Sequence, residues 1–182
     1  EGSKTVGAEL ELGRETYHIF RQRLDELPYA SLLSEGEKRQ VLGGFVWLLA
    51  VQLQGIGRAA EAQRYFRKAI EVYRILDTPD VAALRTVKQL LENRVVSREQ
   101  VTNVLAALPL QAEVKRRFEA IVWDHYQQVR FYGGFQRKEA VLVLSSALPM
   151  IRLAPRRLLQ RGFISICVRS LLSYVLPQRT AA

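Results

Sequence analysis

The chain has little of what metal and redox chemistry require: one cysteine, Cys167, and two histidines, His18 and His125, among 182 residues. A lone cysteine excludes an internal disulfide and any site built from several thiolates. The histidines lie on different expected helices, and His125 directly follows Asp124, so these two adjacent positions do not face one site. We therefore expect no metal site and no cofactor, and we expect Cys167 to be a buried, unreactive thiol.

The chain also lacks the motifs of common catalytic sites. No serine lies in a nucleophile elbow between a strand and a helix, and no glycine-rich phosphate loop follows a strand. The segments GGFVW and GIG both lie within helical sequence. We expect no catalytic residue and no enzymatic activity of this chain alone.

Long apolar runs are missing as well. The longest, residues 162–176, has 15 residues and is interrupted by Arg169, whereas a membrane-spanning helix needs about 20. The first residues lack the basic start and apolar run of a signal peptide. We expect a cytoplasmic protein, with peripheral attachment at the inner face of the membrane as an option.

The whole chain has a net charge of +9, and acidic residues become scarce toward its C-terminal end. Residues 1–109 carry 15 Lys/Arg and 14 Asp/Glu, whereas residues 110–182 carry 12 and 4, and no acidic residue follows Ala140. This bias favours an anionic neighbour such as a lipid headgroup layer. Nucleic acid is disfavoured because only Phe163 and Tyr174 could stack on bases there. The candidate anionic-surface contacts are Arg152, Arg156, Arg157 and Arg161.

Strand alternation is absent, and the signals that remain are helical. Ser34 and Glu37 stand at capping-box spacing before a helix expected to end at Gly55. Gly43 and Gly44 inside this helix cost helix propensity, which predicts a closely packed neighbouring helix.

Further helices are expected along the rest of the chain. Ser97 and Gln100 repeat the capping-box spacing, and the long helix that starts at residue 110 is expected to end at Gly133 and Gly134. Other expected boundaries are the helix start at Thr78–Pro79 and the breaks at Pro109, Pro149 and Pro155.

One segment, GRAAEAQRYFRKAI, has repeat-like spacing. Gly57, Ala62, Phe66 and Ala69 follow one another at steps of five, four and three, which resembles the second half of a tetratricopeptide repeat. A looser copy has Gly134, Ala140, Leu144 and Ala147. Repeat ancestry and two generic helical hairpins both remain open, and both predict grooves between stacked hairpins. The candidate partner groove comprises Val46, Leu49, Leu53, Phe66 and Tyr73.

The C-terminal segment RLAPRRLLQRGFISICVRSLLSYVL combines arginines with an apolar helix. A basic amphipathic helix of this kind can lie on an anionic membrane or a partner. A helix that is apolar nearly all round is instead typically buried in protein. Both interpretations remain open.

The opening EGSKTVG, followed by AELELGRETYHIFRQ, resembles the end of the catalytic domain in bacterial family-two glycosyltransferases. Gly2, Ser3, Lys4 and Thr5 correspond to the Gly-Ser-Lys-Thr-like segment of that family. Many such enzymes carry tails that resemble this repeat-like hairpin and terminal arginine-rich stretch. The family's Asp-x-Asp motif and acidic general base are missing here, so no sugar-transfer residue can be assigned.

These observations predict an all-α fold of stacked antiparallel hairpins, tetratricopeptide-like, with a basic apolar C-terminal helix. Residues 1–7 would be the remnant of a preceding domain or linker, and 8–182 one domain with a near-neutral half, 8–109, and a basic half, 110–182. The resemblance implies a non-catalytic C-terminal module of a glycosyltransferase-type protein. Its partners would be another protein or the parent catalytic domain, and an anionic membrane surface. The alternative is a free-standing adaptor that binds a peptide or helix in the groove.

Overall fold

The computed structural model describes residues 2–26, 28, 30–92 and 98–175, with side chains given from residue 11 onward except at 12, 91 and 92. These residues contain helices and no strand, which confirms the all-α prediction. The α helices are α1 (Gly2–Arg23), α2 (Glu35–Gly55), α3 (Ala59–Glu71), α4 (Pro79–Glu92), α5 (Arg98–Ala106), α6 (Ala112–Gln136), α7 (Ala140–Leu153) and α8 (Arg161–Val175). Short 3₁₀ helices are η1 (Leu24–Glu26), η2 (Ala30–Leu32), η3 (Ile75–Asp77) and η4 (Pro155–Leu159).

The chain divides into two compact units, Glu1–Glu119 and Ala120–Ala182, which we call unit 1 and unit 2. The sequence suggested one domain over 8–182 with a change in charge after residue 109. In the structure, residues 2–7 belong to helix α1, and the division between the units follows residue 119.

Helix α2 begins and ends where the sequence predicts. The Ser34 hydroxyl accepts a hydrogen bond from the Glu37 backbone N–H at 3.2 Å, and the Glu37 carboxylate accepts one from the Ser34 N–H at 2.8 Å. This reciprocal capping box satisfies two backbone donors at the helix start. Helix α2 ends at Gly55, and Gly57 then adopts a φ of 80°, a conformation that favours glycine.

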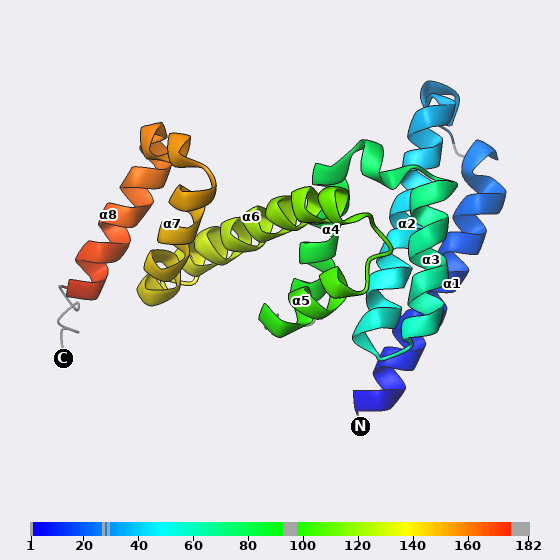
Figure 1. Ribbon diagram of the computed structural model, residues 1–182, viewed down its shortest axis with the longest axis horizontal. Helices are drawn as coiled ribbons and strands as arrows, with labels where there is room; N and C mark the ends of the chain where they lie inside the picture. Colours follow the sequence, from blue (N-terminus) through cyan, green and yellow to red (C-terminus); the bar gives the residue numbers. More distant parts are fainter. Residues whose placement is uncertain (1, 27, 29, 93–97, 176–182) are drawn as a thin grey trace. The chain divides into compact units, whose positions relative to one another are not determined.

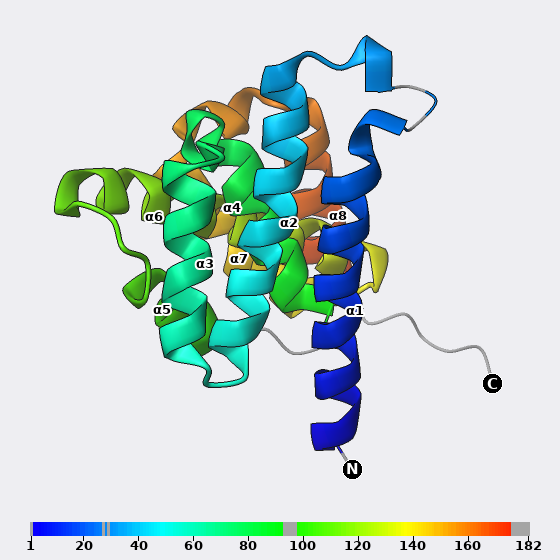
Figure 2. The same ribbon diagram turned by 90° about the vertical axis from the view of Figure 1, so that its right-hand side faces the viewer.

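The turn at Gly57 brings α3 beside α2, and Figures 1 and 2 both show α1, α2 and α3 side by side. Ala62, Phe66 and Ala69 all point into the buried side of α3. A Cβ on Gly43 would lie 2.7 Å from the Cβ of Tyr73, so this part of α2 tolerates no side chain. Close packing at Gly43 is therefore present as predicted, but the neighbour is the turn between α3 and η3, not a long helix.

Trp47 of α2 lies at the centre of the unit 1 core. Its ring makes edge-to-face contacts with Phe66 of α3, at a centroid distance of 5.1 Å, and with Phe118 of α6, at 5.6 Å. Its indole N–H donates to the buried Thr86 hydroxyl at 2.8 Å, and Thr86 donates to the Ala82 carbonyl at 2.9 Å. These bonds satisfy the polar groups that burial removes from water.

Helix α6 does not end at Gly133 and Gly134 as predicted; it continues to Gln136. Gly134 serves packing instead, because a Cβ there would lie 3.2 Å from the Leu142 side chain of α7. The left-handed residue that follows the helix is Lys138, with a φ of 61°. The second repeat-like segment therefore does not turn at its glycine.

In unit 2, α7 and α8 lie side by side and are joined by η4 (Figure 1). The apolar cluster consists of Phe131 from α6, Val143, Ala147 and Met150 from α7, and Phe163 from α8. Phe131 and Phe163 stack at a centroid distance of 4.8 Å. Pro149, predicted as a helix break, lies inside α7. Its neighbours Ala147 and Met150 pack in this cluster, which stabilises the helix across the missing N–H.

Candidate functional site: the exposed face of α8 and an adjoining cavity

The residues predicted to line a partner groove are core residues of unit 1. Exposed fractions are 2% or less for four of them and 8% for Tyr73. The Tyr73 hydroxyl is hydrogen-bonded to the Tyr17 hydroxyl at 2.8 Å. Burial is the main cause that raises the pKa of Tyr73, and this hydrogen bond is the second. The close packing of α1, α2 and α3 thus leaves none of the five side chains on the surface: Val46, Leu49, Leu53, Phe66 and Tyr73.

The four arginines predicted to contact an anionic surface have different environments. Arg157 forms an ion pair with Asp124 at 2.5 Å, and its side chain is 12% exposed. Gln128 also donates to the same Asp124 oxygen, at 2.7 Å. Arg157 therefore stabilises the fold and is not available to a ligand. The other three, Arg152, Arg156 and Arg161, are exposed.

The sequence predicts a buried Cys167, whereas the structure leaves this side chain partly exposed. Cys167 is half-buried beside the unit 2 cluster, and burial raises the pKa of its thiol. A raised pKa lowers the thiolate fraction that reacts with electrophiles. Within the described part of the chain, no group of three His, Cys, Asp or Glu side chains could hold a metal ion.

Helix α8 presents two different faces. Phe163 and Ser170 are buried, and Ile166 and Cys167 are half-buried against the cluster. The opposite side carries apolar residues at helical spacing whose exposed fractions run from 43% to 62%. We call these five residues the outer α8 stripe: Ile164, Val168, Leu171, Leu172 and Val175. Helix α8 is therefore packed on one face and uncovered, among the described residues, on another.

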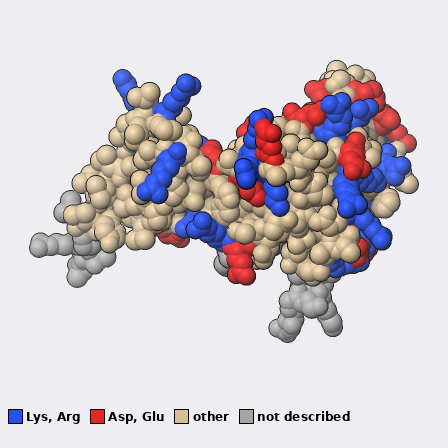
Figure 3. Space-filling view, viewed as in Figure 1, with Lys and Arg blue, Asp and Glu red and all other residues tan. Residues whose placement is uncertain are grey.

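The exposed large apolar residues of the described chain, among them the outer α8 stripe, are concentrated in unit 2. Of the 18 large apolar residues that are exposed in the described chain, 12 lie in unit 2, which is about a third of the sequence. Scattered apolar side chains are ordinary on a protein surface, but a contiguous group marks an interaction site. In Figure 3, isolated blue side chains stand in a largely tan surface over α7 and α8. No helix among the described residues is long and apolar enough to cross a membrane.

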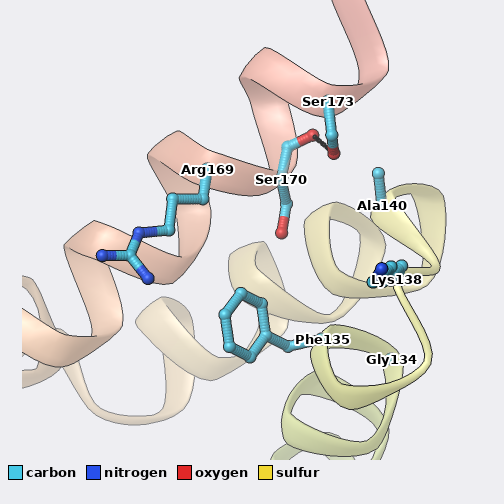
Figure 4. A pocket seen from close by; sticks show the side chains of 7 residues that line it. All are labelled: Gly134, Phe135, Lys138, Ala140, Arg169, Ser170 and Ser173. Carbon is cyan, nitrogen blue, oxygen red and sulfur yellow. Dashed lines mark hydrogen bonds between the residues drawn. The ribbon is translucent and has the colours of Figure 1, made fainter. Parts of the chain in front are cut away.

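An open cavity of about 530 Å³ lies between α8 and the turn that joins α6 to α7. Phe135 and Lys138 come from that turn region, and Ala140 is the first residue of α7. Helix α8 contributes Arg169, Ser170 and Ser173 (Figure 4). The lining thus combines two cations and two hydroxyl groups with an aromatic ring, and contains no acidic residue.

Comparisons with protein-family models, with curated proteins and with solved structures give no match to this chain. Function is therefore inferred from the geometry and charge of the residues themselves.

The cavity residues were missed in the sequence. Ser170 lies on the buried face of α8 and belongs to no motif, and Lys138 becomes recognisable only through its left-handed backbone. One signal was present: Ser165, Arg169 and Ser173 recur every four residues along α8, which places them on one side of the helix. This polar side lies between the packed face and the outer α8 stripe along one edge of the helix.

Proposed function

We propose that this chain is a non-catalytic helical module that rests on an anionic membrane surface through α8. The observation that carries the proposal is the outer α8 stripe, which is apolar, exposed and accompanied by Arg152, Arg156 and Arg161. Interfacial helices have this composition, because apolar side chains enter the boundary between headgroups and acyl chains while cations meet the headgroups.

The positive charge of the segment from α7 to α8 favours an anionic lipid surface over a partner without negative charge. No acidic residue follows position 140, so nothing in α7, η4 or α8 repels an anionic headgroup layer. The one ion-paired arginine of this segment, Arg157, finds its carboxylate on α6, which leaves the exposed three without a described ion pair. Each exposed arginine near the membrane contributes about 1 kcal/mol.

Flotation with vesicles tests the membrane proposal. The parent chain should float with phosphatidylserine-containing vesicles and not with neutral phosphatidylcholine vesicles. Replacing Arg152, Arg156 and Arg161 by Ala removes about 3 kcal/mol and should weaken binding about 100-fold. The matched control removes three exposed cations from unit 1, Arg64, Arg67 and Arg116. Equal, negligible flotation with both vesicle types would refute the proposal.

We further propose that the module belongs to a glycosyltransferase-type protein with lipid-linked acceptors. The proposal is supported by the resemblance of residues 2–5 and by the tetratricopeptide-like spacing of Gly57, Ala62, Phe66 and Ala69 in the α2–α3 hairpin. The last three of these side chains are buried in α3. A reading frame upstream of Glu1 that encodes alternating strands and helices with an Asp-x-Asp motif would support it. A start codon close to Glu1 would contradict it.

The adaptor alternative finds less support. It requires a peptide groove, and the five side chains predicted to line one are buried in the core of unit 1. A peptide partner would have to use another surface of the hairpins.

A further inference from the structure

The cavity beside α8 has the composition of an anion site. Its two charged lining residues, Lys138 and Arg169, are both exposed cations, and the Arg169 guanidinium extends away from Lys138 in Figure 4, so the two charges flank the cavity. The nearest acidic residue along the chain, Glu139, is bound by the Arg137 guanidinium at 2.9 and 3.1 Å, and this pair lowers the pKa of Glu139. Its charge is thus already compensated outside the lining of the cavity.

A second observation is the environment of Ser170. This residue is 4% exposed, and Figure 4 shows its hydroxyl pointing into the cavity. No described residue forms a hydrogen bond with this hydroxyl; only the Ser170 carbonyl is engaged, as acceptor from Ser173 at 2.9 Å. Because this hydroxyl faces the open cavity and has no partner among the described residues, it can donate a hydrogen bond to a ligand there.

The start of α7 adds backbone donors. Ala140, the first residue of this helix, lines the cavity, and no side chain caps the helix start. Uncapped N–H groups and the positive end of the helix dipole favour a negatively charged group. The preceding turn is held in place by the Glu139 N–H, which donates to the Gly134 carbonyl at 2.8 Å.

We propose that this cavity binds a phosphate monoester. Such a group carries a charge close to −2 at neutral pH, which matches Lys138 and Arg169, whereas a carboxylate would leave one cation uncompensated. Ser170 donates to a phosphate oxygen, and Phe135 contacts the esterified group. The volume of about 530 Å³ holds much more than a phosphate ion, so the ester portion also lies inside.

The site would specify the lipid headgroup that the membrane-facing surface binds. That the phosphate belongs to a lipid rests on the proposed function. Phosphatidic acid presents a phosphate monoester at a bilayer surface, whereas phosphatidylserine presents a diester. A lipid ligand therefore predicts preference for phosphatidic acid vesicles over phosphatidylserine vesicles of equal total charge.

Two arms test the site with the full chain. In the first, glycerol phosphate is titrated while backbone amide NMR shifts are followed, with glycerol as the uncharged control. In the second, flotation compares phosphatidic acid with charge-matched phosphatidylserine vesicles. Ser170→Ala and Lys138→Asn should each weaken phosphate binding at least fivefold; asparagine is chosen because it tolerates the φ of 61°. Arg116→Asn in unit 1 is the charge-matched control and should bind as the parent.

The outcomes separate the site from the membrane proposal. Binding of glycerol phosphate without flotation supports the site and refutes the membrane role. Preference for phosphatidic acid that Ser170→Ala abolishes supports a lipid ligand. The site would be overturned if the chain neither bound glycerol phosphate nor preferred phosphatidic acid vesicles. It would also be overturned if both cavity variants bound as well as the parent. A further expected signature is weaker binding below pH 6, where the monoester dianion takes up one proton and its charge falls toward −1.

Discussion

Replacing Leu171 and Leu172 by serine should detach the chain from anionic vesicles without unfolding it. The two side chains are 50% and 52% exposed, so the fold already buries about half of each. Full burial of a leucine is worth about 1.5–3 kcal/mol, so the exposed half contributes about 1 kcal/mol per residue when it enters the membrane. Loss of both should remove about 2 kcal/mol.

This loss corresponds to vesicle binding that is weaker by about 30-fold, since 1.4 kcal/mol is a factor of ten. Vesicle titration with phosphatidylserine-containing liposomes measures the partition, and circular dichroism with thermal unfolding checks the fold. The matched control is Ile19→Ser with Leu32→Ser, two exposed apolar residues of unit 1. A double variant of α8 that partitions like the parent would refute the reasoning. A parent that is dimeric and a variant that is monomeric would assign the outer α8 stripe to a second copy of the chain.

Three further predictions concern stability. Gly43→Ala should lower the free energy of unfolding, measured in urea, by about 1–3 kcal/mol through overpacking. Its new Cβ would lie 2.7 Å from the Tyr73 Cβ, a contact that side-chain rotation cannot relieve. The control Gly36→Ala, whose nearest contact would be 3.8 Å, should raise the free energy of unfolding by up to about 1 kcal/mol. Asp124→Asn should lower the free energy of unfolding by about 1–3 kcal/mol, because Arg157 loses its ion-pair partner. Glu113→Gln, which breaks the exposed pair with Arg117, should change the free energy of unfolding by less than about 0.5 kcal/mol. Hydrogen bonds from the Ser34 backbone and hydroxyl lower the pKa of Glu37, so its stabilising contribution is present above the ordinary carboxyl pKa and is lost as the pH falls through the lowered value. Glu37→Gln should therefore show a shallower loss of thermal stability between pH 5 and pH 3 than the parent, and equal slopes would contradict this assignment.

Local signals made much of the helical fold predictable. The capping box of Ser34 and Glu37 and the end of α2 at Gly55 follow from interactions within a few residues, and the structure has both. The close approach at Gly43 was also predictable, because glycine inside a helix has a cost that only packing offsets.

Long-range contacts decided what the sequence could not show. Gly134 reads as a helix terminator until Leu142 is seen to occupy the space of its missing side chain. Arg157 reads as a free surface cation until Asp124, 33 residues earlier, is found beside it. Repeat-like spacing correctly indicated small and aromatic packing residues in α3, but spacing alone does not tell a groove from a core.

The two tryptophans fall in different units, which gives the molecule a separate optical reporter for each. Trp47 is fully buried among aromatic rings in unit 1, and Trp123 is partly exposed on the α6 segment of unit 2. A Trp123→Phe chain leaves Trp47 as its sole indole, so its emission follows the melting of unit 1 alone. Comparing that emission with the parent's would reveal whether the units melt together or in sequence.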